Sequence, residues 1–129
     1  MDIRFAAARD IPGMIALLQQ VGEVHHRIRP DIFRAGAQKY DEAALEALLH
    51  DPQRPIFTAL EGETLLGYCF CIVETTEGNP VLADDKTLYI DDLCVDENCR
   101  GQHVGKALYE HTCAYARQIG CRTVTLNVW

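Results

Sequence analysis

The chain has 129 residues, the length of a single domain that can bury a hydrophobic core. Its formal net charge of −7 argues against nucleic acid as a partner, because a phosphate backbone is bound by a basic surface. The sequence has no apolar run long enough to span a membrane and does not begin like a signal peptide, so we expect no membrane partner and a cytoplasmic location.

The six cysteines form no C-x-x-C pair, so the sequence predicts no metal site. In a protein without an export signal we expect these thiols to be reduced. The acidic composition would suit a cationic acceptor such as an amine, and it equally suits simple solubility.

The first elements predicted are a strand over residues 3–8 and a helix capped by Asp10 that ends near Gly22. The apolar residues of this helix have helical spacing: Ile11, Met14, Ile15, Leu18 and Val21. A polar and aromatic segment interrupted by Pro30 follows. Asp41 then caps a second helix, predicted over residues 42–50.

Strands are predicted over residues 55–60 and 64–75, joined by a tight turn, with the longer one apolar on both faces as in a covered central strand. A loop over residues 77–86 leads to another strand from Leu88, which completes an antiparallel meander. A helix from about His103 ends at Gly120, and a last strand covers residues 123–129. The order β-α-α-β-β-β-α-β predicts an α/β fold: a mixed, mostly antiparallel sheet flanked by helices.

Residues 88–120 form an apolar strand, a short polar loop with glycines, and a helix. The first N–H groups of a helix have no partner inside it, and the helix dipole adds positive potential there, so this junction is a ready anion site. Gly101 and Gly105 would let a ligand approach the backbone closely. Neither the P-loop pattern nor G-x-G-x-x-G is present.

The loop from Arg100 to Ala107 resembles the R/Q-x-x-G-x-G/A coenzyme A loop of the GNAT superfamily of N-acetyltransferases. Arg100 matches its first position and Gly105 its last, whereas His103 stands where the family usually has its middle glycine. The preceding strand, 90–95, looks like the family's fourth strand.

The resemblance implies one GNAT-like domain over residues 1–129, incomplete at its C-terminus because the family's last helix and strands are absent from this sequence. The final strand would then expose an unpaired apolar edge. We therefore expect a homodimer, and low activity from the 129-residue form.

The implied cosubstrate is acetyl-CoA. Backbone groups of Leu93, Cys94 and Val95 would hold its pantetheine arm. Its pyrophosphate would lie on the loop formed by Arg100, Gly101, Gln102, His103, Val104, Gly105 and Lys106.

Asp91 and Asp92 are the candidate general bases. Successive strand residues face opposite sides, so both could serve one site only if a bulge intervened. We favour Asp91, which would share a face with Leu93 and Val95, because it resembles the acid of polyamine-acetylating members of the family. Either residue could instead be an ordinary hydrogen-bonded aspartate.

The resemblance makes His25, His26 and Phe33 candidates for contact with the acceptor, the alternative being a solvated helix end. Cys94 is expected to be a buried thiol rather than a nucleophile. The sequence thus indicates acetyl transfer to a primary amine of a small molecule or peptide, by direct attack in a ternary complex. A non-catalytic acyl-CoA-binding module is the main alternative; a nucleotide-binding regulatory domain would lack a Mg²⁺ motif.

Overall fold

The computed structural model describes residues 1–32, 34–36, 38–99 and 101–126. In chain order the elements are β1 (Asp2–Phe5), the 3-10 turn η1 (Ala8–Asp10), α1 (Ile11–Ile28), α2 (Glu42–Leu49), β2 (Ile56–Glu61), β3 (Thr64–Thr76), β4 (Asp85–Val95), the 3-10 turn η2 (Glu97–Cys99), α3 (Val104–Gln118) and β5 (Thr123–Leu126). This order confirms the β-α-α-β-β-β-α-β prediction. Within the described residues, no helix is long and apolar enough to cross a bilayer.

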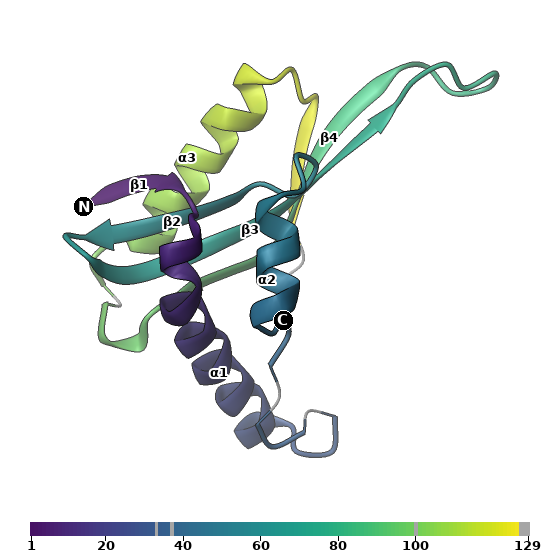
Figure 1. Ribbon diagram of the computed structural model, residues 1–129. Coiled ribbons are helices and arrows are strands. Elements are labelled where there is room, and N and C mark those ends of the chain that lie inside the picture. The colour runs from purple at the N-terminus through teal and green to yellow at the C-terminus, as the bar shows by residue number, and fades with distance from the viewer. Residues whose placement is uncertain (33, 37, 100, 127–129) are drawn as a thin grey trace.

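The five described strands form one sheet in the order β1-β2-β3-β4-β5. The first four are antiparallel neighbours, and β5 pairs in parallel with β4, as the sequence predicted for a mostly antiparallel sheet. The hairpin that joins β3 to β4 extends well beyond the body of the molecule (Figure 1).

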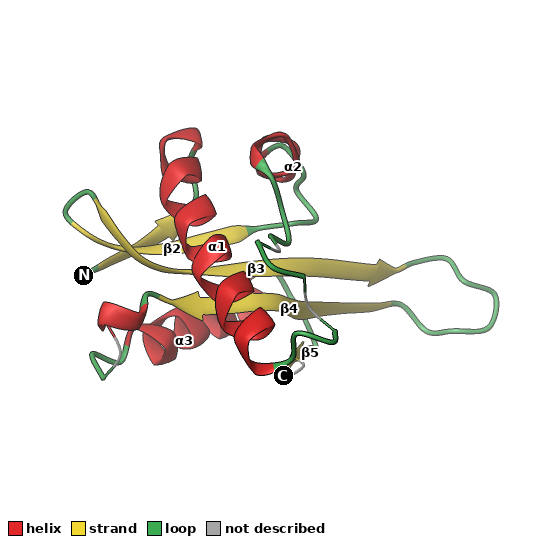
Figure 2. Ribbon diagram, turned by 90° about the horizontal axis from the view of Figure 1, so that it is seen from below, coloured by secondary structure: helices red, strands yellow, loops and turns green. Residues whose placement is uncertain are grey.

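Helices cover both faces of the sheet (Figure 2), with α1 and α2 on one face and α3 on the other. Each face has its own core. On one face, Met14 and Leu18 of α1 and Leu45 of α2 pack against Tyr68 and Phe70 of β3. On the other face Leu88 and Leu108 belong to the core beneath α3. The alternation of β3 side chains between these two cores explains why that strand is apolar on both faces.

The N-terminal strand is shorter than predicted, because the chain turns into η1 after its last ladder bond, Ala6 N–H to Ile56 O at 2.8 Å.

Asp10 does stand just before α1, but its side chain makes no capping bond to that helix. Its carboxylate instead accepts from Ala7 N–H at 2.8 Å and from the Arg4 guanidinium at 2.7 and 3.0 Å. Asp10, predicted to cap α1, therefore links β1 to the turn before that helix by hydrogen bonds.

The prediction that α1 ends at Gly22 was wrong, since the helix continues to Ile28 and buries Gly22 within it. A single interior glycine costs a helix about 1 kcal/mol, which burial of an apolar face easily offsets. The helix ends instead at Ile28, and its C-cap is Arg29, the residue before Pro30, where proline disfavours the helical backbone.

The predicted ends of the other helices are confirmed to within a residue or two. Asp41 caps α2 by accepting from Ala44 N–H at 2.8 Å. After α3, Gly120 adopts a left-handed φ of 87°, and Cys121 N–H bonds back to Ala116 O at 2.8 Å, as expected for a glycine that terminates a helix.

Candidate active site

A bulge in β4 brings two carboxylates to the same face of the sheet. Phe70 of β3 pairs with Asp92, and Cys71 pairs with Ile90, so Asp91 is an extra residue in β4. A bulge disrupts the strict alternation of side chains along a strand. The predicted sharing of a face by Asp91, Leu93 and Val95 is therefore wrong: Leu93 and Val95 pack toward the α3 core.

Two tyrosines show that both carboxylates lie on the α1–α2 face. Tyr40 donates to Asp91 Oδ2 at 2.6 Å, and Tyr68 donates to Asp92 Oδ2 at 3.1 Å. Both tyrosine rings contact the ring of Phe70, with centroids 5.2 and 4.6 Å apart. The site therefore contains two neighbouring carboxylates, each held by a phenol.

Asp91 is bound by two donors from the segment before α2. Its Oδ1 lies 3.1 Å from Lys39 Nζ, which also donates to the Asp91 backbone oxygen at 3.2 Å. Burial, together with the hydrogen bond to Asp91, raises the pKa of Tyr40 to about 12. The phenol thus stays protonated and donates to the carboxylate at neutral pH.

Asp92 has a different environment. Burial raises the pKa of its carboxyl, opposed by the Tyr68 hydrogen bond and the charges of Lys39 and His25. Tyr68 is fully buried, and this burial raises the pKa of its phenol well above the ordinary value. Burial therefore makes the Asp92 carboxyl take up a proton more readily than an ordinary aspartate does.

Beyond the bulge, the described part of β5 leaves β4 unpaired on one side. The parallel ladder runs from Thr87↔Thr123 to Ile90↔Leu126. Residues 91–95 thus have no β5 partner among the described residues. Cys94 is buried on the α1–α2 face with its Sγ 3.8 Å from Val95 O, which favours the prediction of a structural thiol.

The loop after β4 leads directly into α3, whose N-terminus has no side-chain cap from His103. The first helical bond joins Ala107 N–H to His103 O at 3.0 Å, so the N–H groups of Val104, Gly105 and Lys106 lie ahead of it. Gly101 and His103 have left-handed backbones, with φ of 87° and 60°. Gln102 is exposed between them, and Arg100 lies outside the described residues.

Gly105 has a different role from the one predicted for ligand approach. A Cβ built on it would point at the sheet, 3.4 Å from Val95 Cγ2 and 3.6 Å from Leu93 Cδ2. The absence of a side chain at this position therefore lets α3 pack closely on β4. It does not open the backbone to a ligand from solvent.

Of the predicted acceptor residues, His25 lies close enough to Asp92 for its charge to lower the pKa of that carboxyl. His25 and His26 lie in the last turns of α1, which continues past Gly22, and both side chains are half-buried. Phe33 lies outside the described residues.

Sequence reasoning missed Lys39, Tyr40 and Tyr68 as site residues. It also missed Arg54, which lines a small recess together with Tyr40 and Asp91. No local pattern signals these side chains, since Tyr40 and Asp91 are 51 residues apart in the chain.

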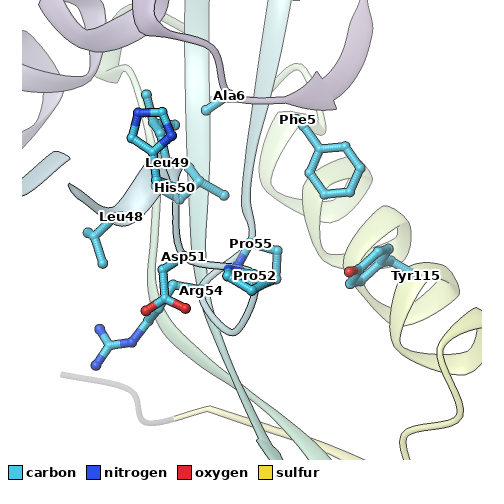
Figure 3. A pocket seen from close by; sticks show the side chains of 11 residues that line it. Phe5, Ala6, Leu48, Leu49, His50, Asp51, Pro52, Arg54, Pro55 and Tyr115 are labelled. Atoms are coloured by element: carbon cyan, nitrogen blue, oxygen red, sulfur yellow. The ribbon is translucent and has the colours of Figure 1, made fainter. Parts of the chain in front are cut away.

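A larger hollow of about 370 Å³ lies where β1 leaves the sheet (Figure 3). Phe5 and Tyr115 form one side of it, and His50, Asp51 and Arg54 lie on another. It shares Arg54 with the recess beside Asp91 but does not contain either carboxylate. Within the part of the chain that the structure describes, no cluster of His, Cys, Asp and Glu could hold a metal ion.

Several solved structures share this fold, although no curated protein matched the chain. A variant of a protein from Bacillus halodurans superimposes with a TM-score of 0.89 at 28% identity, over 100% of this chain and 83% of that one. An acetyltransferase from Vibrio fischeri has a TM-score of 0.82 at 19% identity, covering 100% and 97%. An aminoglycoside acetyltransferase from an uncultured soil sample, solved with sisomicin, has a TM-score of 0.70 at 23% identity, covering 99% and 77%.

The family comparison agrees with the fold and with the strand-loop-helix described above. The profile of the acetyltransferase (GNAT) family matches residues 21–129, which include both carboxylates, the loop after β4 and α3. The chain belongs to the GNAT family of acetyltransferases.

Proposed function

We propose that this chain is an acetyl-CoA-dependent N-acetyltransferase that acts on a primary amine of a small molecule or peptide. The observation that carries this proposal is the bulge at Asp91, which places two carboxylates on one face immediately before residues 93–95. Membership of the family supports acetyl transfer in general. The identity of the amine rests on the chemistry of the site.

The proposed acetyl-CoA site combines β4 and the start of α3. Backbone groups of Leu93, Cys94 and Val95 would hold the pantetheine arm, on the side of β4 that faces away from β3, because the described β5 ladder ends at Ile90. The N–H groups at residues 104–106, which lie ahead of the bond from Ala107 to His103, and the helix dipole would receive the pyrophosphate. Arg100, Gly101, Gln102 and His103 would complete the loop.

We propose Asp91 as the general base, because the Lys39 amine and the Tyr40 phenol both reach its carboxylate, with the buried Asp92 beside it. Direct attack by the amine is favoured over a covalent enzyme intermediate, because the Cys94 thiol is buried. His25, His26 and Phe33 are proposed on the acceptor side. Two aspartates at the site suit a cationic amine better than an anionic acceptor.

The test is acetyl transfer to a panel of amines and peptides, followed by release of the CoA thiol. Asp91→Asn should lower kcat by about 10²- to 10⁴-fold, the usual contribution of a general base, with CoA affinity unchanged. Asp92→Asn should have a smaller effect on kcat. Wild-type turnover by folded Asp91→Asn would contradict the assignment, and CoA binding without thiol release from any amine would favour the non-catalytic module.

A further inference from the structure

The Lys39 ammonium forms an ion pair with Asp91, the carboxylate that we assign as the base. It lies 3.1 Å from Asp91 Oδ1 and donates to the backbone oxygen of the same residue at 3.2 Å. Tyr40 donates to the other carboxylate oxygen, Oδ2, at 2.6 Å. Both oxygens of the Asp91 carboxylate thus have donors, and the amine placed to lose a proton to Asp91 is that of Lys39.

The pair contributes only modestly to stability. The side chain of Lys39 is 44% exposed and that of Asp91 16%, so solvent screens the attraction between the two charges. Partial exposure also leaves Lys39 Nζ accessible to a second reactant. The pair is local to the proposed site, because the bulge that makes Asp91 an extra residue lies just before residues 93–95, where the acetyl donor would be held.

We propose that Lys39 is an internal acceptor, acetylated on its own Nζ within the same chain; this rests on the proposed function of the site. Lys39 Nζ gives a proton to Asp91 and attacks the carbonyl carbon of the thioester. The new C–N bond forms as the C–S bond breaks, the nitrogen gives up a second proton, and the leaving CoA thiolate takes up that proton. The products are N-acetyl-lysine at position 39 and the free thiol.

Acetylation would also change the site. An acetylated Nζ has no positive charge and one N–H in place of three, so the ion pair with Asp91 is lost. Asp91 Oδ1 then becomes available to an external amine. A chain acetylated at Lys39 should therefore bind a cationic acceptor more tightly than the unmodified chain does.

The chain carries its own reference for this test, because its other lysines, Lys86 and Lys106, have partners other than the two aspartates. Lys106 is 72% exposed and pairs only loosely with Glu110 at 3.9 Å, so uncatalysed acetylation should favour it. Lys86 donates to Ile119 O at 3.0 Å and is partly buried.

The experiment incubates the purified chain with acetyl-CoA alone and follows each lysine by peptide mass mapping. Lys39 should be acetylated at least about tenfold faster than Lys106, a modest share of what general base catalysis supplies. The rate should not change on dilution of the protein, as a reaction within one chain requires. Asp91→Asn should reduce labelling of Lys39 to the level of Lys106, and Lys39→Arg should remove that label alone.

Equal or slower labelling of Lys39 than of Lys106 in the wild-type chain would overturn this inference without any variant. If external amines are acetylated while Lys39 stays unmodified, the inference fails and the proposed function stands. If the wild-type chain does not bind CoA, both fail. A rate that rises with protein concentration would show transfer between chains and contradict the internal reaction.

Discussion

His103 has a left-handed backbone, with φ of 60°, at the position where the family usually has a glycine. A side chain in this conformation costs about 1 kcal/mol, which glycine avoids. His103→Gly should therefore raise the free energy of unfolding by up to about 1 kcal/mol and bind CoA at least as well. Chemical denaturation and CoA titration measure the two effects.

The matched control is Gln102→Gly in the same exposed loop. Among the described residues other than glycine, His103 alone has a positive φ, so Gln102 gains nothing from glycine there and should lose roughly 0.5–1 kcal/mol to chain entropy. A large loss of CoA affinity in His103→Gly would show instead that the imidazole contacts the ligand.

At the scale of elements, Asp10 ties β1 to the turn before α1 through Arg4 and Ala7. Its side chain is 5% exposed, so Asp10→Ala should cost about 3 kcal/mol, as expected for breaking a buried pair. Asp31→Ala removes the exposed pair with Arg29 and should change stability little. An equal loss in both variants would contradict this account of Asp10.

The pH dependence of the Asp10 effect has a definite sign. Burial would raise the pKa of this carboxyl, but the Arg4 and Ala7 hydrogen bonds and the charge of Arg4 lower it overall. A carboxyl with a lowered pKa stabilises the fold above its ordinary pKa, and this stabilisation is lost as pH falls through the lowered value. The difference between wild type and Asp10→Ala should therefore shrink in acid.

The N-terminus of α3 is best tested by charge, because Gly105 faces the sheet. Lys106→Glu reverses an exposed charge in the first turn, and should weaken CoA binding roughly tenfold, on the order of 1 kcal/mol. Arg117→Glu makes the same change of net charge in the last turn of the helix and should leave affinity unchanged. Equal losses in calorimetric titrations would show a general charge effect rather than a site at residues 104–106.

At the scale of the whole molecule, β5 is one of the two outer strands of the described sheet, and Leu126 on it is 43% exposed. Such an edge offers unpaired backbone groups and apolar area to another chain. We predict that the chain self-associates, with β5 edges in contact, and that Leu126→Lys weakens this association. Sedimentation at tens of micromolar tests it; a monomer under those conditions would contradict the prediction.

Most of the architecture was predictable because it depends on neighbours in the sequence. The cap at Asp41, the glycine that ends α3 and the strand-loop-helix from β4 to α3 arise from contacts within a few residues. The period of the apolar residues identified the covered face of each element. The predicted end of α1 was wrong for the same reason. Gly22 is a local signal for a helix end, and burial of the helix against the core overrides that signal.

The arrangement of the site depended on the tertiary structure. The sequence alone determined the order of elements, the acidic pair Asp91–Asp92 and the loop into α3. Only the folded chain decided that a register shift against β3 turns both carboxylates to one face. It also decided that Tyr40, Tyr68 and Lys39 hold them, across separations of 51, 24 and 52 residues. Such partners are fixed by how strands and helices pack, and no local periodicity carries that information.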